Sequence, residues 1–297
     1  MNHSNQIMEA VPNFSEGRNL NIIDKLLTPL RSTEGVRLLD YSRDEDHNRM
    51  VATMAGHPDA LRQAITDAVG IAIACIDLNR HRGEHPRIGA VDVIPFIPLR
   101  GYDMEAAVRL ARETAAGIAS RYPQLPVILY EEAATAPHRR NLADLRRGEF
   151  EGLDAKLQRP EWQPDYGPAR RHPTAGAVAV GARRPLIAFN VNLGTTDIRI
   201  AKEIASSVRQ SGGGLPACKA LGIELRSKGM VQVSMNLTDY TLTGIHQAYE
   251  AVSREADKRG ISVACCELIG MIPQEAAAHS LGHFLRISNF NSQQILI

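Results

Sequence analysis

Long apolar runs are missing from this sequence, and so is an excess of charge of one sign. No stretch approaches the roughly 20 consecutive apolar residues of a membrane span, so we expect no membrane segment. The formal net charge of only +1 at pH 7 argues against a protein that coats nucleic acid through bulk charge, although a local basic patch is compatible with it. Aromatic residues make up only 5%, but the 44% hydrophobic content exceeds that of a disordered chain. The 297 residues therefore predict one large or two modest folded domains.

Cysteine is also scarce, and several catalytic motifs are missing. None of the four cysteines, Cys75, Cys218, Cys265 and Cys266, belongs to a C-x-x-C pair. The N-terminus lacks the basic flank and apolar run of a secretory signal, so we expect reduced thiols, mostly in the core, and a cytoplasmic location. The chain contains no G-x-S-x-G, and the glycines at 212–214 are followed by no Lys-Ser or Lys-Thr. Neither a serine hydrolase nor a dinucleotide or phosphate-loop protein is indicated.

What is present is an alternation of short apolar runs with helical patterns. The first half predicts the order β-α-β-β-α-β, in which Pro95 and Pro98 favour an edge position or an irregular end for the last strand. The second half repeats that order. The predicted strands of the first half are 7–11, 36–41, 50–56 and 90–99, with helices from about Leu20 and Pro58, and those of the second half are 185–193, 220–225, 230–237 and 261–272, with helices from about Thr196 and over 242–259.

This repetition predicts an α+β protein in which two ferredoxin-like, split β-α-β subdomains arose by duplication. Between the halves we expect a helix over 103–121, a strand over 127–131 and a long polar stretch over about 133–175. A structureless run of that length inside a compact protein is usually functional, so this stretch, which holds the only tryptophan, is predicted to carry a binding site.

The densest group of reactive side chains is NRHRGEHPRIG at 79–89. His81 to His85 spell H-x-x-E-H, the letters of an inverted zinc peptidase motif, but Gly83 and Pro86 favour a turn over the helix that such a motif needs. The neighbouring arginines would also repel a divalent cation, so we expect no metal. Two interpretations stay open: a histidine that transfers protons among carboxylate-binding arginines, or a solvated helix end.

Two further clusters have both a structural and a functional interpretation. The run Asp44 to Arg49 is typical of a solvated, charged hairpin loop. In Val11 to Gly17, Asn13 or Ser15 is expected to cap the first helix, whose free N–H groups could alternatively face an anion.

Several of these segments, taken together and in order, resemble the formiminotransferase family. They cover about residues 8–278 and are VPNFSEG (11–17), Asn48-Arg49, GEHPRIGAVDVIPFIPL (83–99), LADLRRGEFEGL (142–153), EW-x-PD-Y-GP (161–168) and FNVNL (189–193). The resemblance implies transfer of a formimidoyl group between N-formimidoyl-L-glutamate and tetrahydrofolate, the co-substrate, in histidine degradation. It also implies subdomains at 1–178 and 179–297 with a folate cleft between them, and a homodimer. Since the chain is too short to include the cyclodeaminase fused to the family domain in animals, that enzyme would be a separate partner.

The resemblance also assigns roles to individual residues. The family's catalytic histidine corresponds to His85, which would act as general acid and base between the two amines. Charge and position, rather than the resemblance, make Arg49, Arg82 and Arg87 candidates to contact substrate carboxylates, together with Arg170 and Arg171 of the folate segment. That folate segment comprises Gly167, Pro168, Ala169, Arg170, Arg171, His172, Pro173, Thr174, Ala175 and Gly176. Met50 stands where family members commonly have Ser or Thr, so any hydroxyl role there is lost.

Three other functions remain as alternatives at this point. The same scaffold could transfer a formyl group from N-formylglutamate, because the two donors differ by one atom. A folate-binding protein without catalysis is a second alternative, and the intact GEHPR string argues against it. A zinc hydrolase is the third.

Overall fold

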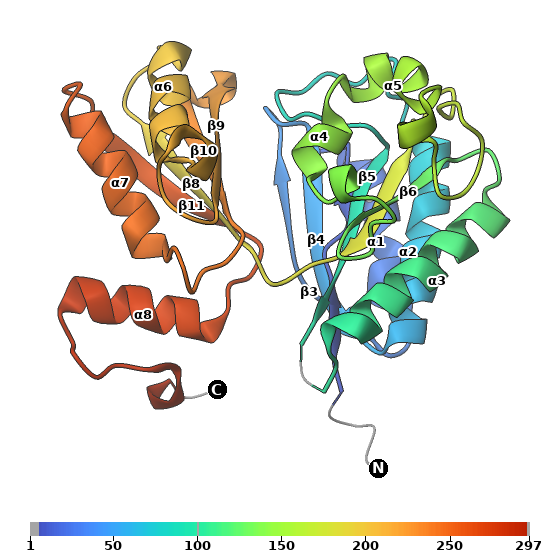
Figure 1. Ribbon diagram of the computed structural model, residues 1–297, viewed down its shortest axis with the longest axis horizontal. Coiled ribbons are helices and arrows are strands. Elements are labelled where there is room, and N and C mark those ends of the chain that lie inside the picture. The colour runs from blue at the N-terminus through green and yellow to red at the C-terminus, as the bar shows by residue number, and fades with distance from the viewer. Residues whose placement is uncertain (1–5, 100, 296–297) are drawn as a thin grey trace. The chain divides into compact units, whose positions relative to one another are not determined.

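The computed structural model describes residues 6–99 and 101–295 and combines helices with two β-sheets (Figure 1). The chain divides into two compact units, one of the described residues up to Arg183 and one of those from Arg184 onward. Each unit has its own sheet and its own buried apolar cluster. None of the helices in the described ranges has the length and apolar character to cross a membrane.

The first unit is built on a seven-stranded mixed sheet. Its strands are β1 (Met8–Ala10), β2 (Asn13–Phe14), β3 (Val36–Asp44), β4 (Arg49–Gly56), β5 (Val91–Pro98), β6 (Val127–Glu131) and β7 (Val178–Ala182). Across the sheet the order is β3, β4, then β1 and β2 together, β5, β7 and β6. Only β7 is parallel to its neighbours β5 and β6, and the other pairs are antiparallel.

Strand β5 lies inside this sheet, so the edge position predicted from its prolines is wrong. It pairs with β1 and β2 on one side and with β7, a strand that the sequence patterns missed, on the other. Pro98 is the last residue of the strand, and the carbonyl of Pro95 accepts a hydrogen bond from the Val11 amide over 3.1 Å. Pro95 lies opposite the break between β1, which pairs with residues 96–98, and β2, which pairs with residues 91–93, and sheets tolerate proline at such irregular positions.

Helices cover both faces of the first sheet. Three of them, α1 (Leu20–Ser32), α2 (Pro58–Cys75) and α3 (Met104–Arg121), pack on one face, and α4 (Leu142–Arg146) and α5 (Glu149–Leu157) pack on the other (Figure 1). The N-cap of α1 is Asn19, whose side chain accepts from the amides of Asn21 and Ile22. Capping by Asn13 or Ser15 was therefore a wrong prediction.

The polar stretch at 133–175 is more ordered than its composition indicated. It contains α4, α5 and the 3-10 turns η2 (Pro137–Arg139) and η3 (Pro160–Trp162). These helices are too short to produce a clear hydrophobic period, which explains why the prediction of a structureless run was wrong. The longest part without regular structure covers about residues 163–177.

The second unit is a four-stranded antiparallel sheet in the order β11, β8, β10, β9. Its strands are β8 (Ile187–Leu193), β9 (Cys218–Leu225), β10 (Met230–Leu237) and β11 (Val263–Ile269). The helices α6 (Ile198–Val208) and α7 (Ile245–Asp257) supply the apolar residues that pack against it, and α8 (Gln274–Leu285), which the sequence patterns missed, contacts α7. Cys265 and Cys266 are exposed on β11, so a core role for these two thiols was a wrong prediction.

Candidate active site

The segment that joins α2 to β5 is irregular, as its glycine and proline predicted, and it packs against the turn between β3 and β4. The Glu84 amide donates to the Asp46 carbonyl over 3.0 Å, and the side-chain amide of Asn48 donates to the Arg82 carbonyl over 3.0 Å. A Cβ atom at Gly83 would lie only 2.2 Å from the His47 carbonyl oxygen. Only glycine permits this close approach, which brings the two segments together.

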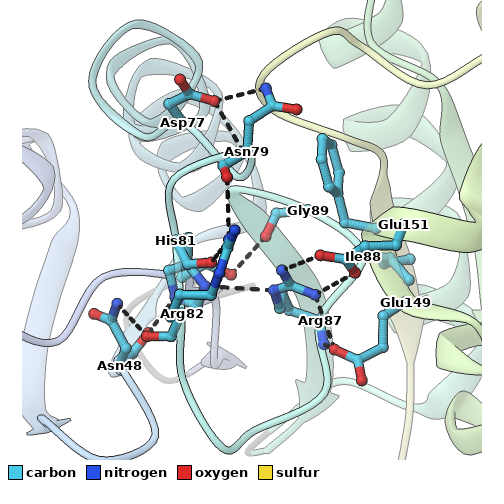
Figure 2. Close-up of polar contacts among 12 residues, drawn as sticks. Asn48, Asp77, Asn79, His81, Arg82, Arg87, Ile88, Gly89, Glu149 and Glu151 are labelled. Atoms are coloured by element: carbon cyan, nitrogen blue, oxygen red, sulfur yellow. Dashed lines mark hydrogen bonds and ion pairs between the residues drawn. The ribbon is translucent and has the colours of Figure 1, made fainter.

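His81 has a structural role at the base of this segment. Its Nε2 lies 2.8 Å from the Asn48 carbonyl oxygen, and its Nδ1 accepts a hydrogen bond of 3.3 Å from Nε of Arg87 (Figure 2). These partners require a neutral ring with the proton on Nε2. Burial, more than any neighbouring charge, lowers the pKa of His81, so the ring stays neutral at pH 7 and neither nitrogen is available for proton transfer.

Arg87 is equally occupied. Its side chain is only 8% exposed and forms ion pairs of 2.9 Å with Glu149 and 2.8 Å with Glu151, both at the start of α5 (Figure 2). The hydrogen bonds from Arg87 lower the pKa of Glu151 to about 2. Because its donors are taken up by protein groups, Arg87 attaches the segment to α5 and has little capacity for a substrate carboxylate.

His85 is partly buried at a small pocket of about 190 Å³ of empty space. The pocket is lined by Phe14, Ser15, His47, Asn48, Arg49, His81, His85, Arg87 and Asp92. Burial, followed by the positive charges of Arg49 and Arg146, holds the pKa of His85 well below its ordinary value. His85 is therefore neutral at pH 7 and able to accept a proton.

Arg49 supplies the pocket with an unsatisfied positive charge. On β4 the side chains of Met50 and Ala52 belong to the core cluster under the helices, so Arg49 points to the opposite face. It donates a short hydrogen bond to the Asn13 side chain, whereas its buried Nε has no hydrogen-bond partner among the described residues. Burial and the nearby Arg146 lower the pKa of Arg49 to about 9, so it stays charged at pH 7. A buried donor of this kind favours binding of an anion.

Asp92 and Arg146 form a buried ion pair beside the pocket. Nε of Arg146 donates to Asp92 over 2.9 Å, and the second oxygen of Asp92 accepts from the Ile88 amide over 2.8 Å. Their side chains are 4% and 12% exposed. The sequence analysis predicted neither residue to belong to the site. A carboxylate inside the apolar run 90–99 is a signal for Asp92, whereas Arg146 has no comparable local signal.

The prediction of a solvated loop over Asp44 to Arg49 was wrong for His47 and Asn48, because both are buried. The oxygen of the Asn48 side chain accepts from the Gly17 amide over 3.0 Å, which joins the 11–17 segment to the same cluster. The rings of His47 and His85 lie 5.9 Å apart between centroids and are tilted by 36°. The turn from Asp44 to Arg49 is thus a wall of the pocket.

The segment from Gly167 to Gly176 lies beside the His85 segment. Pro173 and Thr174 accept hydrogen bonds of 2.9 and 2.8 Å from the Asn79 side chain and the Leu78 amide, and the Ala175 carbonyl accepts from the Ala90 amide over 2.9 Å. Both terminal glycines have positive φ angles, +84° and +70°. A Cβ at Gly176 would lie 2.0 Å from the Ile88 carbonyl oxygen, so a side chain there would separate the segments.

The remaining predicted arginines differ in availability. Arg171 is held by Asp154 at 3.1 Å and by the Phe150 carbonyl at 2.8 Å, and its guanidinium lies 4.0 Å from the Phe150 ring centroid. Arg170 is exposed, as is Arg82, which donates to the carbonyls of Asn79 and His81. Among the site's arginines, Arg49 is the one with a buried donor left over.

The fold is of the α+β class, and its first unit holds a neutral histidine beside a buried arginine. This combination suits acid–base chemistry on an acidic substrate. A family model of the formiminotransferase domain's N-terminal subdomain matches residues 7–183, and the model of the formiminotransferase domain matches residues 188–294. The chain belongs to the formiminotransferase family.

The similar proteins include some that are named for one activity and some that are named for two. A glutamate formimidoyltransferase of Streptococcus pyogenes is 43% identical over 98% of this chain and 97% of its own length. One of Thermoplasma acidophilum is 41% identical over 98% and 96%. The formimidoyltransferase-cyclodeaminase of Dictyostelium discoideum is 40% identical, and the match covers 96% of this chain but only 54% of that protein.

Among the described residues, no group of three or more histidine, cysteine, aspartate or glutamate side chains is arranged to hold a metal ion.

Proposed function

We propose that this protein is a glutamate formimidoyltransferase. It transfers the formimidoyl group between N-formimidoyl-L-glutamate and N5 of tetrahydrofolate in histidine degradation, with His85 as general acid and base. The names of relatives that match nearly the whole chain support the activity. The observation that carries the assignment of the site is the neutral His85 beside Arg49, whose buried Nε has no partner among the described residues.

The chemistry needs one proton to leave and one to arrive. N5 of the folate attacks the amidine carbon, and a tetrahedral carbon bearing three nitrogens results. The attacking nitrogen then loses a proton, and the glutamate nitrogen gains one before its bond to carbon breaks. A neutral imidazole can accept the first proton and return it to the second nitrogen, which typically contributes about 10²–10⁴-fold in rate.

The substrate's carboxylates need cationic contacts. Arg49 is the strongest choice for glutamate, because its buried donor lacks a partner among the described residues and its charge persists at pH 7. Arg82 and Arg170 are exposed and able to reach the acidic tail of the folate. We leave Arg87 out of this role because its donors are occupied.

Only about 10 Å³ of the pocket's empty space is wide enough for a small molecule, far below the roughly 300–1,000 Å³ typical of whole-ligand sites. The reacting end would therefore contact the side chains that line the pocket without being enclosed by it, while the segment Gly167 to Gly176, which lies beside the His85 segment, would contact the rest of the folate.

The architecture proposed with this function is a duplicated, ferredoxin-like unit. The strand order β3, β4, β1/β2, β5 in the first unit and β9, β10, β8, β11 in the second is the same, and both series are antiparallel with helices at equivalent crossovers, which supports duplication. Subdomains at 1–178 and 179–297, a folate cleft between them, a homodimer, a cytoplasmic location and a separate cyclodeaminase partner remain parts of this proposal.

Turnover of N-formimidoyl-L-glutamate with tetrahydrofolate, followed optically and compared with N-formyl-L-glutamate as donor, tests the function. We expect turnover with the formimidoyl donor to exceed that with the formyl donor. The reverse order would favour the formyltransferase alternative. Binding of tetrahydrofolate without turnover of either donor would favour the non-catalytic alternative.

A further inference from the structure

A second histidine belongs to the proposed pocket, and the proposed reaction has a step for it. This inference rests on the proposed function. Proton removal occurs at N5 of the folate, whereas proton delivery occurs at the glutamate nitrogen, on the other side of the tetrahedral carbon. A single imidazole, as proposed for His85, can serve both nitrogens in turn only if it reaches both within the lifetime of that intermediate. A second imidazole at the same pocket would remove that requirement.

His47 is positioned for the second role. It is only 8% exposed, lines the same pocket as His85, and its ring centroid is 5.9 Å from that of His85. Its backbone is well held, because the His47 amide donates to the Asp44 side chain over 2.8 Å and its carbonyl packs against Gly83. The two rings thus reach the pocket from two different segments, the β3–β4 turn and the α2–β5 connection.

The groups around the pair carry charges of both signs. The cationic groups that face it are Arg49, Arg146 and Arg87, the anionic groups are Asp92 and Asp44, and His81 is neutral. A positive charge on His47 lowers the pKa of His85, in addition to the larger effects of burial and the arginines. The two rings are therefore coupled electrostatically, because a proton on one opposes a proton on the other.

We propose that His47 is a second catalytic residue, which donates a proton to the departing glutamate nitrogen while His85 accepts one from N5 of the folate. The C–N bond to N5 forms, the C–N bond to glutamate breaks, and the proton gained by His85 equals the proton lost by His47. Proton exchange through the pocket restores the starting state. In the reverse direction the two histidines exchange roles.

Steady-state turnover of His47→Gln over pH 5.5–9 tests this proposal. We expect kcat to fall by at least about 10²-fold, with unchanged tetrahydrofolate binding and with the loss of the limb of the kcat–pH profile that reports the acid. Added imidazole should partly restore turnover in His47→Ala. The matched control is His57→Gln, because His57 is exposed before α2 and its side chain makes no capping hydrogen bond.

A His47→Gln enzyme with kcat within about threefold of the parent, or with a lower kcat but both limbs retained, overturns the proposal. If the variants fold poorly, ¹⁵N-imidazole spectra of the parent protein decide. One neutral and one protonated ring at pH 7 supports the pair, and two neutral rings contradict it. Failure of the parent itself to turn over either donor would instead refute the proposed function.

Discussion

Histidines gather in both units, but their surroundings differ. In the second unit the rings of His246 and His283 are stacked 4.4 Å apart, and Nε2 of His283 lies 2.7 Å from a carboxylate oxygen of Glu250 at the surface. In the first unit His85 is beside arginines and partly buried. A solvated imidazole with a carboxylate partner joins α7 to α8, whereas an imidazole among cations stays neutral and available as a base. Whether a histidine has a structural or a catalytic role therefore depends on the charged and hydrogen-bonding groups around its ring.

The elements that create this difference belong to the first unit. Arg146 comes from α4, and Glu149 and Glu151 come from α5. The second unit shares the order of four strands with the first but has no helices equivalent to α4 and α5 among its described residues. These two helices therefore bring both the cation that affects His85 and the carboxylates that occupy Arg87.

The largest effect should come from His85→Ala. Loss of a general acid–base group lowers turnover by about 10²–10⁴-fold, while tetrahydrofolate should still bind. His283→Ala in the second unit is the matched control and should leave kcat unchanged. Stopped or continuous optical assays of both variants make the comparison. Equal losses in the two would remove the distinction between the clusters.

Arg49→Ala should act next most strongly. A charge-assisted hydrogen bond to a buried donor contributes roughly 1.5–3 kcal/mol, so we expect the KM for N-formimidoyl-L-glutamate to rise about tenfold to a hundredfold. Arg226→Ala, on the exposed turn η5 (Arg226–Lys228) of the second unit, is the control. An unaltered KM in Arg49→Ala would argue against a substrate contact.

Arg87→Met should reduce stability instead. It leaves the buried His81 without its donor, and an unsatisfied buried group costs about 1–3 kcal/mol in the free energy of unfolding. Glu149 and Glu151 are 43% and 61% exposed, so water replaces their lost partner. Urea titration measures the loss, and Glu250→Gln provides a surface ion-pair control. A raised KM with unchanged stability would mean that Arg87 contacts substrate after all.

The smallest expected effect is on how the stability of the protein changes with pH. Because the folded-state pKa of His85 is depressed, the unfolded chain binds the extra proton first, and stability falls as the pH drops below the ordinary value of about 6.5. Each pH unit below it costs up to about 1.4 kcal/mol per such histidine. His85→Gln should flatten this slope relative to the parent protein, measured as melting temperature between pH 5 and 8. A parallel slope in the variant and the parent would contradict the pKa direction.

Hydrophobic periodicity was sufficient for the larger elements of the fold. The strand predicted over 230–237 coincides with β10, and the helix predicted from about Pro58 is α2, which begins at Pro58. The patterns failed for β7 and for α4, α5 and α8. The helices α4 and α5 contain too few residues to define a clear period, and a fully buried strand such as β7 shows no alternation. The 12 residues of α8 were long enough, but no apolar stripe was recognised in them.

The sequence likewise predicted only part of the candidate site. The GEHPR string identified His85, and its glycine and proline correctly predicted an irregular segment. The interpretation of the Asp44 to Arg49 run as solvated was wrong for His47 and Asn48, since polarity in a loop does not reveal whether a second loop covers it.

The sequence alone determined the order of the strands and helices that the two units share, the irregular His85 segment and membership in the formiminotransferase family. Only the tertiary structure decided which polar groups are occupied. Arg87 meets carboxylates 62 and 64 residues away, while the Nε of Arg49, buried on the opposite face of its strand from the core, has no partner among the described residues. Burial and pairing depend on segments that are distant along the chain, so no local pattern contains them. They nevertheless determine the pKa values and free donors on which the chemistry depends.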